Sequence, residues 1–267
     1  MISYLAVRRR IHGEVRILFS TKSWLVILLG LVDLLFFSSV FRNIAYMRNE
    51  QSPPLKDLGW EMIPKIPQEY RYLSEVSLAL VTFLALSLPA VVVCYRPVEQ
   101  TLSALLLIDR WVVFNAIGHF LRAITFLSTS LPAPSDFCQS SPDYNPPQEL
   151  GSVFISDQIF VLIQPNGSCG DLLFSGHMLM TLSSTLMVFW YSNQVIFPAV
   201  WLPRAWQMIA MGCALIQPLL ILGSRHHYTV DIVVALYTVP MLWVLYTRYV
   251  GEPLYPNDLL PIKAAGA

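Results

Sequence analysis

The sequence is short of charge. Of its 267 residues only 13% are Asp, Glu, Lys or Arg, whereas 55% are hydrophobic. A soluble domain of this size carries about a quarter charged residues, so the shortage predicts an integral membrane protein. The formal net charge is zero and no long basic run is present, which argues against nucleic acid as a partner.

Paired cysteines are also missing. The four cysteines form no CxxC pair, so we expect no zinc site. Cys94 and Cys213 lie in apolar stretches, where a cysteine is a small core residue. Cys138 and Cys169 flank one polar loop, and a disulfide between them is compatible with an oxidising lumen. Residues 1–22 lack an apolar core followed by a cleavage site, so no removable signal peptide is predicted.

Six stretches approach the roughly twenty apolar residues that a bilayer demands of a helix. They cover residues 24–41, 76–95, 111–131, 172–196, 206–222 and 230–249. Together they predict an all-α bundle of six transmembrane helices. A cytosolic N-terminal segment (1–23) would precede the transmembrane domain (24–250), and a cytosolic tail (251–267) would follow it.

Basic residues indicate the orientation of this bundle. The segment before the first stretch is rich in arginine, whereas residues 123–203 contain no Lys or Arg. The positive-inside rule then places the N-terminus in the cytosol and the long loop 132–170 in the lumen or outside the cell. Asn166 begins a glycosylation sequon in this loop, and residues 153–163 are apolar enough for a short interfacial helix.

Two polar motifs lie at the starts of hydrophobic stretches, on what the topology makes the same membrane face. They are Cys-Gly-Asp-Leu-Leu-Phe-Ser-Gly-His (169–177) and Ser-Arg-His-His-Tyr-Thr-Val-Asp (224–231). If the second runs into a helix, His227 and Asp231 share one face, and the carboxylate fixes which imidazole nitrogen can react. His177 then supplies the second imidazole of a metal-free phosphoryl transfer, one to attack phosphorus and one to move the leaving group's proton.

Several residues of the two motifs are candidate phosphate ligands. Ser175 and Gly176 form a turn into a helix, whose free N–H groups suit an anion. Arg225 is interpreted as a clamp for the donor phosphate, with an interfacial snorkelling cation as the alternative. Asp171 is interpreted as a helix cap. His226 is treated as a neighbour outside the site, because successive helical residues point about 100° apart.

Arg122 is expected about 13 Å inside the third helix, where an unpaired cation is costly. It should therefore face a polar cavity, either pairing with Asp171 or Asp231 or binding phosphate. His119, one turn earlier, lines the same cavity or makes a structural hydrogen bond. The same cost favours a catalytic over a merely structural role for the pair of His227 and Asp231.

Both motifs resemble the two catalytic signatures of the sphingomyelin synthase family, a branch of the lipid phosphate phosphatase superfamily. Residues 53–59 (Pro-Pro-Leu-Lys-Asp-Leu-Gly) and 122–134 resemble two further family segments. The resemblance implies transfer of a phospho-head group from a glycerophospholipid to the primary hydroxyl of ceramide, without metal or cofactor. His227 would be the nucleophile, Asp231 its orienting carboxylate, and His177 the acid and then the base.

The chain departs from the family pattern at Lys56, where proline is frequent, and at Met178, where threonine is common. Residues 57–60 and 130–134 look closer to plant and protozoan sphingolipid synthases than to animal ones. Such relatives use phosphatidylinositol, phosphatidylcholine or phosphatidylethanolamine, and no residue decides among these donors. The family implies the Golgi or the plasma membrane, with a lumenal or extracellular active site. The sequence is silent on oligomeric state.

Two other functions fit the same residues. A lipid phosphatase or phospholipase C of this architecture would use the same catalytic groups, with water in place of ceramide. A non-catalytic membrane protein could bind sphingolipid in an inherited pocket, but such a protein has no need for His177, His227 and Asp231 together.

Overall fold

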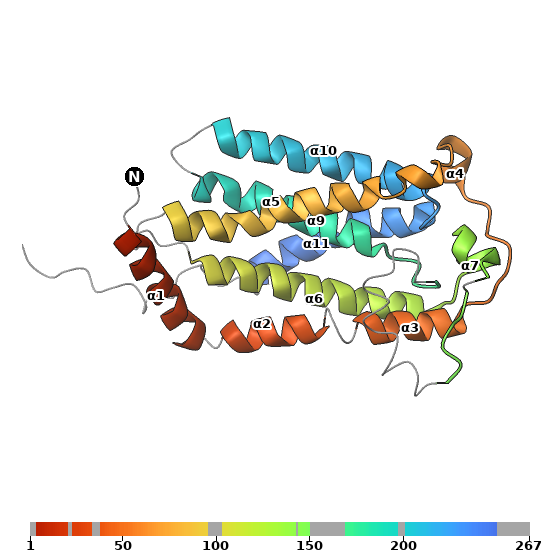
Figure 1. The fold of residues 1–267 in the computed structure, drawn as a ribbon, viewed down its shortest axis with the longest axis horizontal. Coiled ribbons are helices and arrows are strands. Elements are labelled where there is room, and N and C mark those ends of the chain that lie inside the picture. Colours follow the sequence, from red (N-terminus) through yellow and green to blue (C-terminus); the bar gives the residue numbers. More distant parts are fainter. Residues whose placement is uncertain are drawn as a thin grey trace, which may run out of the picture.

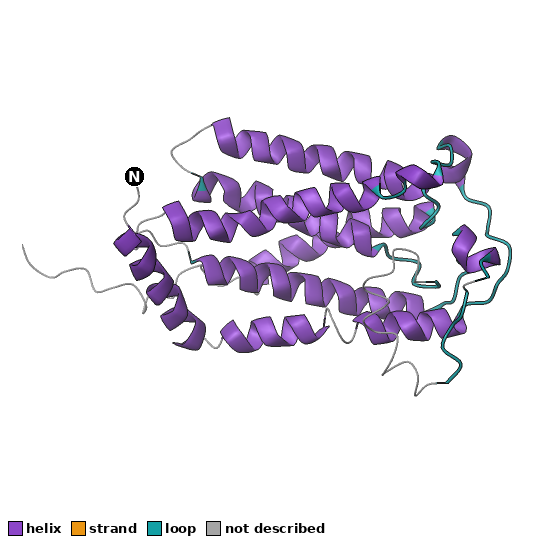
Figure 2. Ribbon diagram, in the orientation of Figure 1, coloured by secondary structure: helices purple, strands orange, loops and turns teal. Residues whose placement is uncertain are grey.

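The computed structural model describes residues 4–20, 23–33, 38–95, 103–142, 144–149, 169–196 and 201–249. Within these ranges every regular element is a helix (Figure 2). The predicted interfacial helix at 153–163, the sequon at Asn166 and the C-terminal tail 251–267 lie outside the described residues.

Five long helices form the bundle and run side by side (Figure 1). They are α5 (Leu73–Tyr95), α6 (Ala104–Ser128), α9 (Gly176–Val195), α10 (Trp201–Gly223) and α11 (Thr229–Tyr249). Helix α9 is the central element, because it packs against each of the other four. The shorter helices α2 (Ser23–Val32) and α3 (Ser38–Arg48) follow one another along α6.

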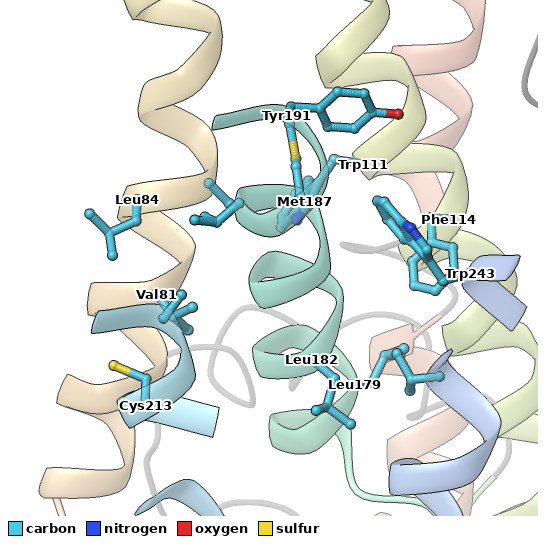
Figure 3. Packing of buried hydrophobic residues seen from close by; sticks show 14 of the residues in the cluster. Val81, Leu84, Trp111, Phe114, Leu179, Leu182, Met187, Tyr191, Cys213 and Trp243 are labelled. Atoms are coloured by element: carbon cyan, nitrogen blue, oxygen red, sulfur yellow. The ribbon is translucent and has the colours of Figure 1, made fainter. Parts of the chain in front are cut away.

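The core lies around α9 and joins all five long helices. Figure 3 shows side chains of α9 between those of its neighbours: Leu179, Leu182, Met187 and Tyr191 with Val81, Leu84, Trp111, Phe114, Cys213 and Trp243. Phe114 of α6 and Trp243 of α11 make an edge-to-face contact with ring centroids 5.0 Å apart. In a membrane bundle such side chains would otherwise face lipid, so close packing between helices, more than removal from water, stabilises this core.

Helix α9 is also the most polar of the long helices on its buried surface. Its buried hydroxyl side chains are Thr181, Ser183, Ser184, Thr185 and Ser192. Most of them find partners inside the bundle; Ser183, for example, donates to the amide oxygen of Asn115 at 2.9 Å, whereas the Thr181 hydroxyl has no partner among the described residues. Because α9 meets other helices on several sides, it has less need of an apolar surface than a helix that faces lipid.

Four helical segments are long and apolar enough to cross a membrane. They are Gln68–Cys94, Ala104–Ser128, Trp201–Gly223 and Thr229–Tyr249, and a fifth arises if α1 and α2, bent by 75°, count as one span. The predicted spans at 24–41 and 172–196 are not among the four: the first is divided between α2 and α3, and the second is the polar α9. The chain is an all-helical, multi-pass membrane protein.

The third predicted span begins earlier than expected. Helix α6 starts at Ala104 rather than at residue 111, and ends at Ser128 rather than at 131. The charged Arg110 was expected in the loop before this span. In the structure Arg110 lies within α6 and donates to the hydroxyl of Tyr191 at 2.7 Å inside the bundle. A side chain with an internal partner does not have to end a helix.

The N-terminal helix α1 (Tyr4–Ser20) crosses the end of the bundle at which α6 begins (Figure 1). Its buried Glu14 forms an ion pair with Arg10 at 3.0 Å. The same carboxylate accepts hydrogen bonds from the Ser103 hydroxyl at 2.6 Å and from the Ala104 amide at 3.1 Å. Glu14 therefore satisfies free N–H groups at the start of α6, where negative charge is favourable.

The opposite end of the bundle, here called the site end, carries the starts of α9 and α11 together with short helices. These are α4 (Leu58–Met62), η2 (Gln68–Tyr70) and α7 (Asp136–Ser140). A disulfide joins Cys138 of α7 to Cys169, the first residue of the first polar motif, with a Cα–Cα distance of 5.8 Å. Asp136 pairs with Lys65 and Arg71 at 2.8 Å each. The loops of the site end are thus tied to one another.

Candidate active site

His227 and Asp231 form the pair that the sequence predicted. Helix α11 begins at Thr229, so His227 lies just before the helix and Asp231 in its first turn. The Nδ1 atom of His227 and the Oδ2 atom of Asp231 are 2.8 Å apart, and both residues are buried. Asp231 also accepts the amides of Tyr228 at 3.1 Å and Leu173 at 2.8 Å. Three hydrogen bonds thus hold the Asp231 carboxylate in place.

This contact determines which nitrogen of His227 can react. A carboxylate only accepts hydrogen bonds, so the contact assigns the proton to Nδ1. The lone pair is then on Nε2, on the other side of the ring. A neutral imidazole with a free Nε2 is a nucleophile or a base.

His177, the second residue of α9, has a carboxylate partner of its own. Its Nε2 atom is 2.6 Å from Oε1 of Glu75, in the first turn of α5. The rings of His177 and His227 have centroids 6.3 Å apart. The two histidines that the sequence placed on one membrane face therefore meet, and each has a carboxylate on one nitrogen. Glu75 was missed in the sequence because this residue directly precedes the predicted span 76–95 and follows a segment with similar numbers of acidic and basic residues. Its position at the start of a hydrophobic stretch was the available signal.

His226 also belongs to this cluster, contrary to the prediction. Its ring stacks with that of His177 at a centroid distance of 6.4 Å. The prediction was wrong because residues 226 and 227 precede α11, so helical spacing does not separate their side chains. Burial, followed by the nearby rings of His177 and His227, lowers the pKa of His226 to about 4. His226 is therefore a neutral imidazole at physiological pH.

Arg122 lies against the start of α9. Its guanidinium pairs with the carboxylate of Asp171, and its Nε donates to the Phe174 carbonyl at 2.8 Å. Of the possibilities raised by the sequence, the structure shows the pair with Asp171. A Cβ at Gly176 would come within 3.2 Å of the Arg122 Cζ atom. Glycine at 176 thus allows the guanidinium to approach the first residue of α9.

Ser175, rather than Asp171, caps α9. The Ser175 hydroxyl accepts the Met178 amide at 3.4 Å, and the Ser175 amide donates to the backbone carbonyl of Asp231 at 3.2 Å. The second bond links the start of α9 to the first turn of α11. Asp171 is engaged by Arg122 instead, which corrects its expected role as a cap.

Two further basic residues, Arg42 and His119, lie close to Arg122. Arg42 of α3, which the sequence analysis did not single out, interacts electrostatically with both Asp171 and Arg122. His119 is half-buried on α6 near the two arginines, and its Nδ1 has no hydrogen-bond partner among the described residues. Two guanidinium groups thus lie around one carboxylate, which leaves an excess of positive charge beside the start of α9.

Arg225 is occupied by backbone groups. It adopts a left-handed conformation with φ 59°, and its guanidinium donates to the carbonyls of Leu222, Trp60 and Ile63 at 3.1 Å each. The Cζ atom lies 5.2 Å from the centre of the Trp60 ring. These contacts describe a structural residue that joins α4 to the second motif, and they lend no support to the predicted phosphate clamp.

The arrangement as a whole has three imidazoles and two carboxylates at the mouth of a helical bundle. Within the part of the chain that the structure describes, no three His, Cys, Asp or Glu side chains are grouped as metal ligands would be. A helical membrane protein with two histidine–carboxylate pairs at one end defines a class of protein whose site suits acid–base and nucleophilic chemistry.

Comparison with known proteins gives the family within this class. Residues 168–248 match the family model described as PAP2 superfamily C-terminal. The chain is 32% identical over 263 residues to a phosphatidylinositol:ceramide inositolphosphotransferase of Oryza sativa subsp. japonica, covering 94% of this chain and 74% of that protein. It is 30% identical over 249 residues to phosphatidylinositol:ceramide inositolphosphotransferase 2 of Arabidopsis thaliana, with 90% and 75% covered.

A relative named for another head group covers less of the chain. A phosphatidylethanolamine:ceramide ethanolaminephosphotransferase of Trypanosoma brucei brucei is 31% identical over 130 residues, 48% of this chain and 36% of that protein. The chain belongs to the sphingomyelin synthase family, whose named members are ceramide phosphotransferases, and the resemblance found in the sequence is confirmed.

Proposed function

We propose that this protein transfers a phospho-head group from a glycerophospholipid to the primary hydroxyl of ceramide and releases diacylglycerol. The observation that carries the proposal is the approach of His177 and His227, with ring centroids 6.3 Å apart and a separate carboxylate on each ring. One imidazole is oriented as a nucleophile, and the other is placed to move a proton.

In the first step the Nε2 atom of His227 attacks the donor's phosphorus. The P–N bond forms as the P–O bond to diacylglycerol breaks, and protonated His177 gives its proton to the departing oxygen. Asp231 stabilises the positive charge that develops on His227, and Glu75 stabilises the imidazolium form of His177.

In the second step ceramide replaces diacylglycerol. His177, now neutral, removes the proton of the primary hydroxyl while the oxygen attacks phosphorus. The P–N bond breaks, His227 returns to its neutral form, and His177 regains the proton that it gave up in the first step. The cycle leaves both histidines as they began and needs no external proton.

The phosphate would lie against the N-terminus of α9. The amides of Gly176 and His177 are among the free N–H groups of the first turn, and Arg122 adds a positive charge beside them. Arg122, Ser175 and Gly176 therefore stay in the proposed phosphate site, whereas Arg225 is left out because its guanidinium binds carbonyls.

Phosphoinositol is the head group that we propose. The relatives named as phosphatidylinositol:ceramide transferases from rice and Arabidopsis match 90–96% of this chain, whereas the choline and ethanolamine relatives match 48–76%. The site rim also fits a polyhydroxylated group, because His226 and Glu75 provide a donor and an acceptor beside His177. A choline group would call for an aromatic cage.

We further propose that the site end faces the lumen or the cell exterior, in Golgi or plasma membrane, with residues 1–23 and 251–267 in the cytosol and six spans in all. The arginine-rich start of the chain supports this orientation. The disulfide between Cys138 and Cys169 supports it as well, because disulfides persist in oxidising compartments.

Product analysis tests the proposed function. The purified protein is incubated with fluorescent ceramide and, separately, phosphatidylinositol, phosphatidylcholine or phosphatidylethanolamine, beside a His227→Ala control. We expect a fluorescent phosphoinositol ceramide with the first donor only, absent from the control. Diacylglycerol release without any ceramide product would favour the hydrolase, and silence with all three donors in folded protein would favour a binding protein.

A further inference from the structure

We propose that Asp57 and Trp60 are positioning residues for His227. They lie in the proline-containing segment between α3 and α5, whose residues 55–63 are here called the brace. The inference rests on the proposed function, because it assigns to His227 the attacking nitrogen. Neither residue contacts that nitrogen; both act on the backbone that carries the ring.

Asp57 holds the start of α11. Its Oδ2 accepts the Thr229 amide at 2.8 Å, and its Oδ1 accepts the Thr229 hydroxyl at 2.6 Å. The first N–H groups of a helix have no partner within the helix, and a side chain that caps them stabilises the helix start. Here the capping carboxylate comes from a distant segment, so the brace and the first turn of α11 are fixed to one another. That turn carries Asp231, the partner of His227.

Trp60 holds the backbone of His227 itself. Its indole N–H donates to the His227 carbonyl at 3.2 Å. Its ring stacks on Tyr228, with centroids 4.8 Å apart and planes inclined by 22°. The guanidinium of Arg225 lies over the same indole and donates to the Trp60 carbonyl. The residues on both sides of His227 are thereby bound to one tryptophan.

The remaining contacts of the brace act at the same place. The Leu55 amide donates to the Tyr228 hydroxyl at 3.0 Å, and the Gly59 amide donates to the Thr229 hydroxyl at 3.0 Å. A Cβ at Gly59 would lie 2.3 Å from the Thr229 Oγ1 atom, so only glycine permits this approach. In all, residues 225, 227, 228 and 229 each bind the brace.

The brace completes what the bond to Asp231 begins. That bond sets the tautomer and rotation of the His227 ring, but both residues belong to one turn and would move together. The brace fixes this turn to the segment that leads into α5, whose Glu75 is the partner of His177, and so adds to the direct bond between the Ser175 amide and the Asp231 carbonyl. Because a misplacement of 1 Å at a reacting group can cost about 100-fold in rate, such a constraint bears on catalysis.

The experiment compares Trp60→Phe, Asp57→Asn and Gly59→Ala with wild type. Trp60→Phe keeps an aromatic ring and removes the bond to the His227 carbonyl. Asp57→Asn weakens the cap, and Gly59→Ala displaces the brace without removing any donor. The matched control is Asp136→Asn, which breaks two exposed ion pairs at the site end and has no contact with His227. Initial rates at varied ceramide and donor give kcat and KM, and thermal unfolding gives the melting temperature.

We expect each brace variant to lose about tenfold in kcat, with KM changed less than twofold and the control unaltered. Wild-type kcat in all folded brace variants would overturn the proposal, as would a loss in the control as large as theirs. If one variant fails to fold, the other two still test the proposal, because each of the three perturbs a different contact between the brace and residues 227–229. Absence of turnover in wild type would instead contradict the proposed function, so the two failures are distinguishable.

Discussion

The two histidines that we propose as catalytic differ in how deeply their carboxylate partners are buried. The side chains of His227 and Asp231 are 7% and 0% exposed, whereas those of His177 and Glu75 are 27% and 51% exposed. A buried carboxylate with three hydrogen bonds suits the fixed role of orienting a nucleophile. The exposed pair suits the residue that exchanges protons with two successive substrates.

This difference predicts unequal effects of two conservative variants. Asp231→Asn should lower kcat by about 10³–10⁴-fold, because it reverses the hydrogen-bond pattern that keeps the His227 Nε2 lone pair free. Glu75→Gln should lower kcat by about 10–10²-fold, because His177 keeps its ring and its place. Initial rates of product formation with fluorescent ceramide measure both. A larger loss in Glu75→Gln would contradict the assignment of nucleophile and acid.

His226 should make the fold sensitive to acid. Its pKa in the folded protein is about 4, below the ordinary value of 6.5. Between these values the unfolded chain binds the proton more tightly, so the stability that neutral His226 supplies is complete above pH 6.5 and is lost as pH falls toward 4. His226→Asn should therefore flatten the fall of melting temperature between pH 6.5 and 5. An exposed histidine changed in parallel, His12→Asn, should leave that slope as in wild type.

The positions of the helices along the chain were predicted from the sequence more accurately than the contacts between the helices. The hydrophobic stretches located α5, α10 and α11 to within a few residues, because apolar length is a local property. They did not show that α9 is enclosed by four other helices, nor that α6 begins at Ala104. The position of α9 and the start of α6 each depend on partners that are distant in the chain. Asn115 accepts from the Ser183 hydroxyl of α9, and Glu14 accepts from the first amides of α6.

The contact between α1 and α6 gives a prediction at this scale. Glu14→Ala removes the acceptor for the Ser103 hydroxyl and the Ala104 amide and breaks the buried ion pair with Arg10. Loss of such a cap costs about 1 kcal/mol, and loss of the buried ion pair adds to it. Thermal unfolding in detergent should show a lower melting temperature, with kcat of the folded fraction unchanged. Glu50→Ala, at an exposed glutamate, is the control and should have no effect.

At the scale of the whole molecule, the site could be predicted only in part. The spacing of His227 and Asp231 and the shared membrane face of His177 could be inferred from sequence, because both follow from helix geometry and topology. Glu75 and Trp60 could not, since no local pattern relates them to the second motif, and the place of His226 depended on α11 beginning only at Thr229. Arg225 illustrates the reverse case: its position suggested a phosphate ligand, and three backbone carbonyls occupy it instead.

The disulfide gives a further prediction for the molecule. It closes a loop with a sequence separation of 31 between Cys138 and Cys169, a constraint that stabilises by about 3 kcal/mol on the chain-entropy scale. Dithiothreitol should therefore lower the melting temperature of the wild-type protein. The double variant Cys138→Ser, Cys169→Ser should melt at the lower temperature with or without reductant. Identical melting of wild type in both conditions would show that the bridge does not stabilise the fold.

The most direct test of the mechanism is to isolate its covalent intermediate. Purified protein is mixed with phosphatidylinositol labelled in the inositol ring, without ceramide, quenched, and examined for label bound to protein. The mechanism predicts an acid-labile adduct on His227 that disappears when ceramide is added, with label passing into the sphingolipid product, and no adduct in His227→Ala. Full turnover in His227→Ala, or an equal adduct on that variant, would contradict the assignment of His227 as the nucleophile.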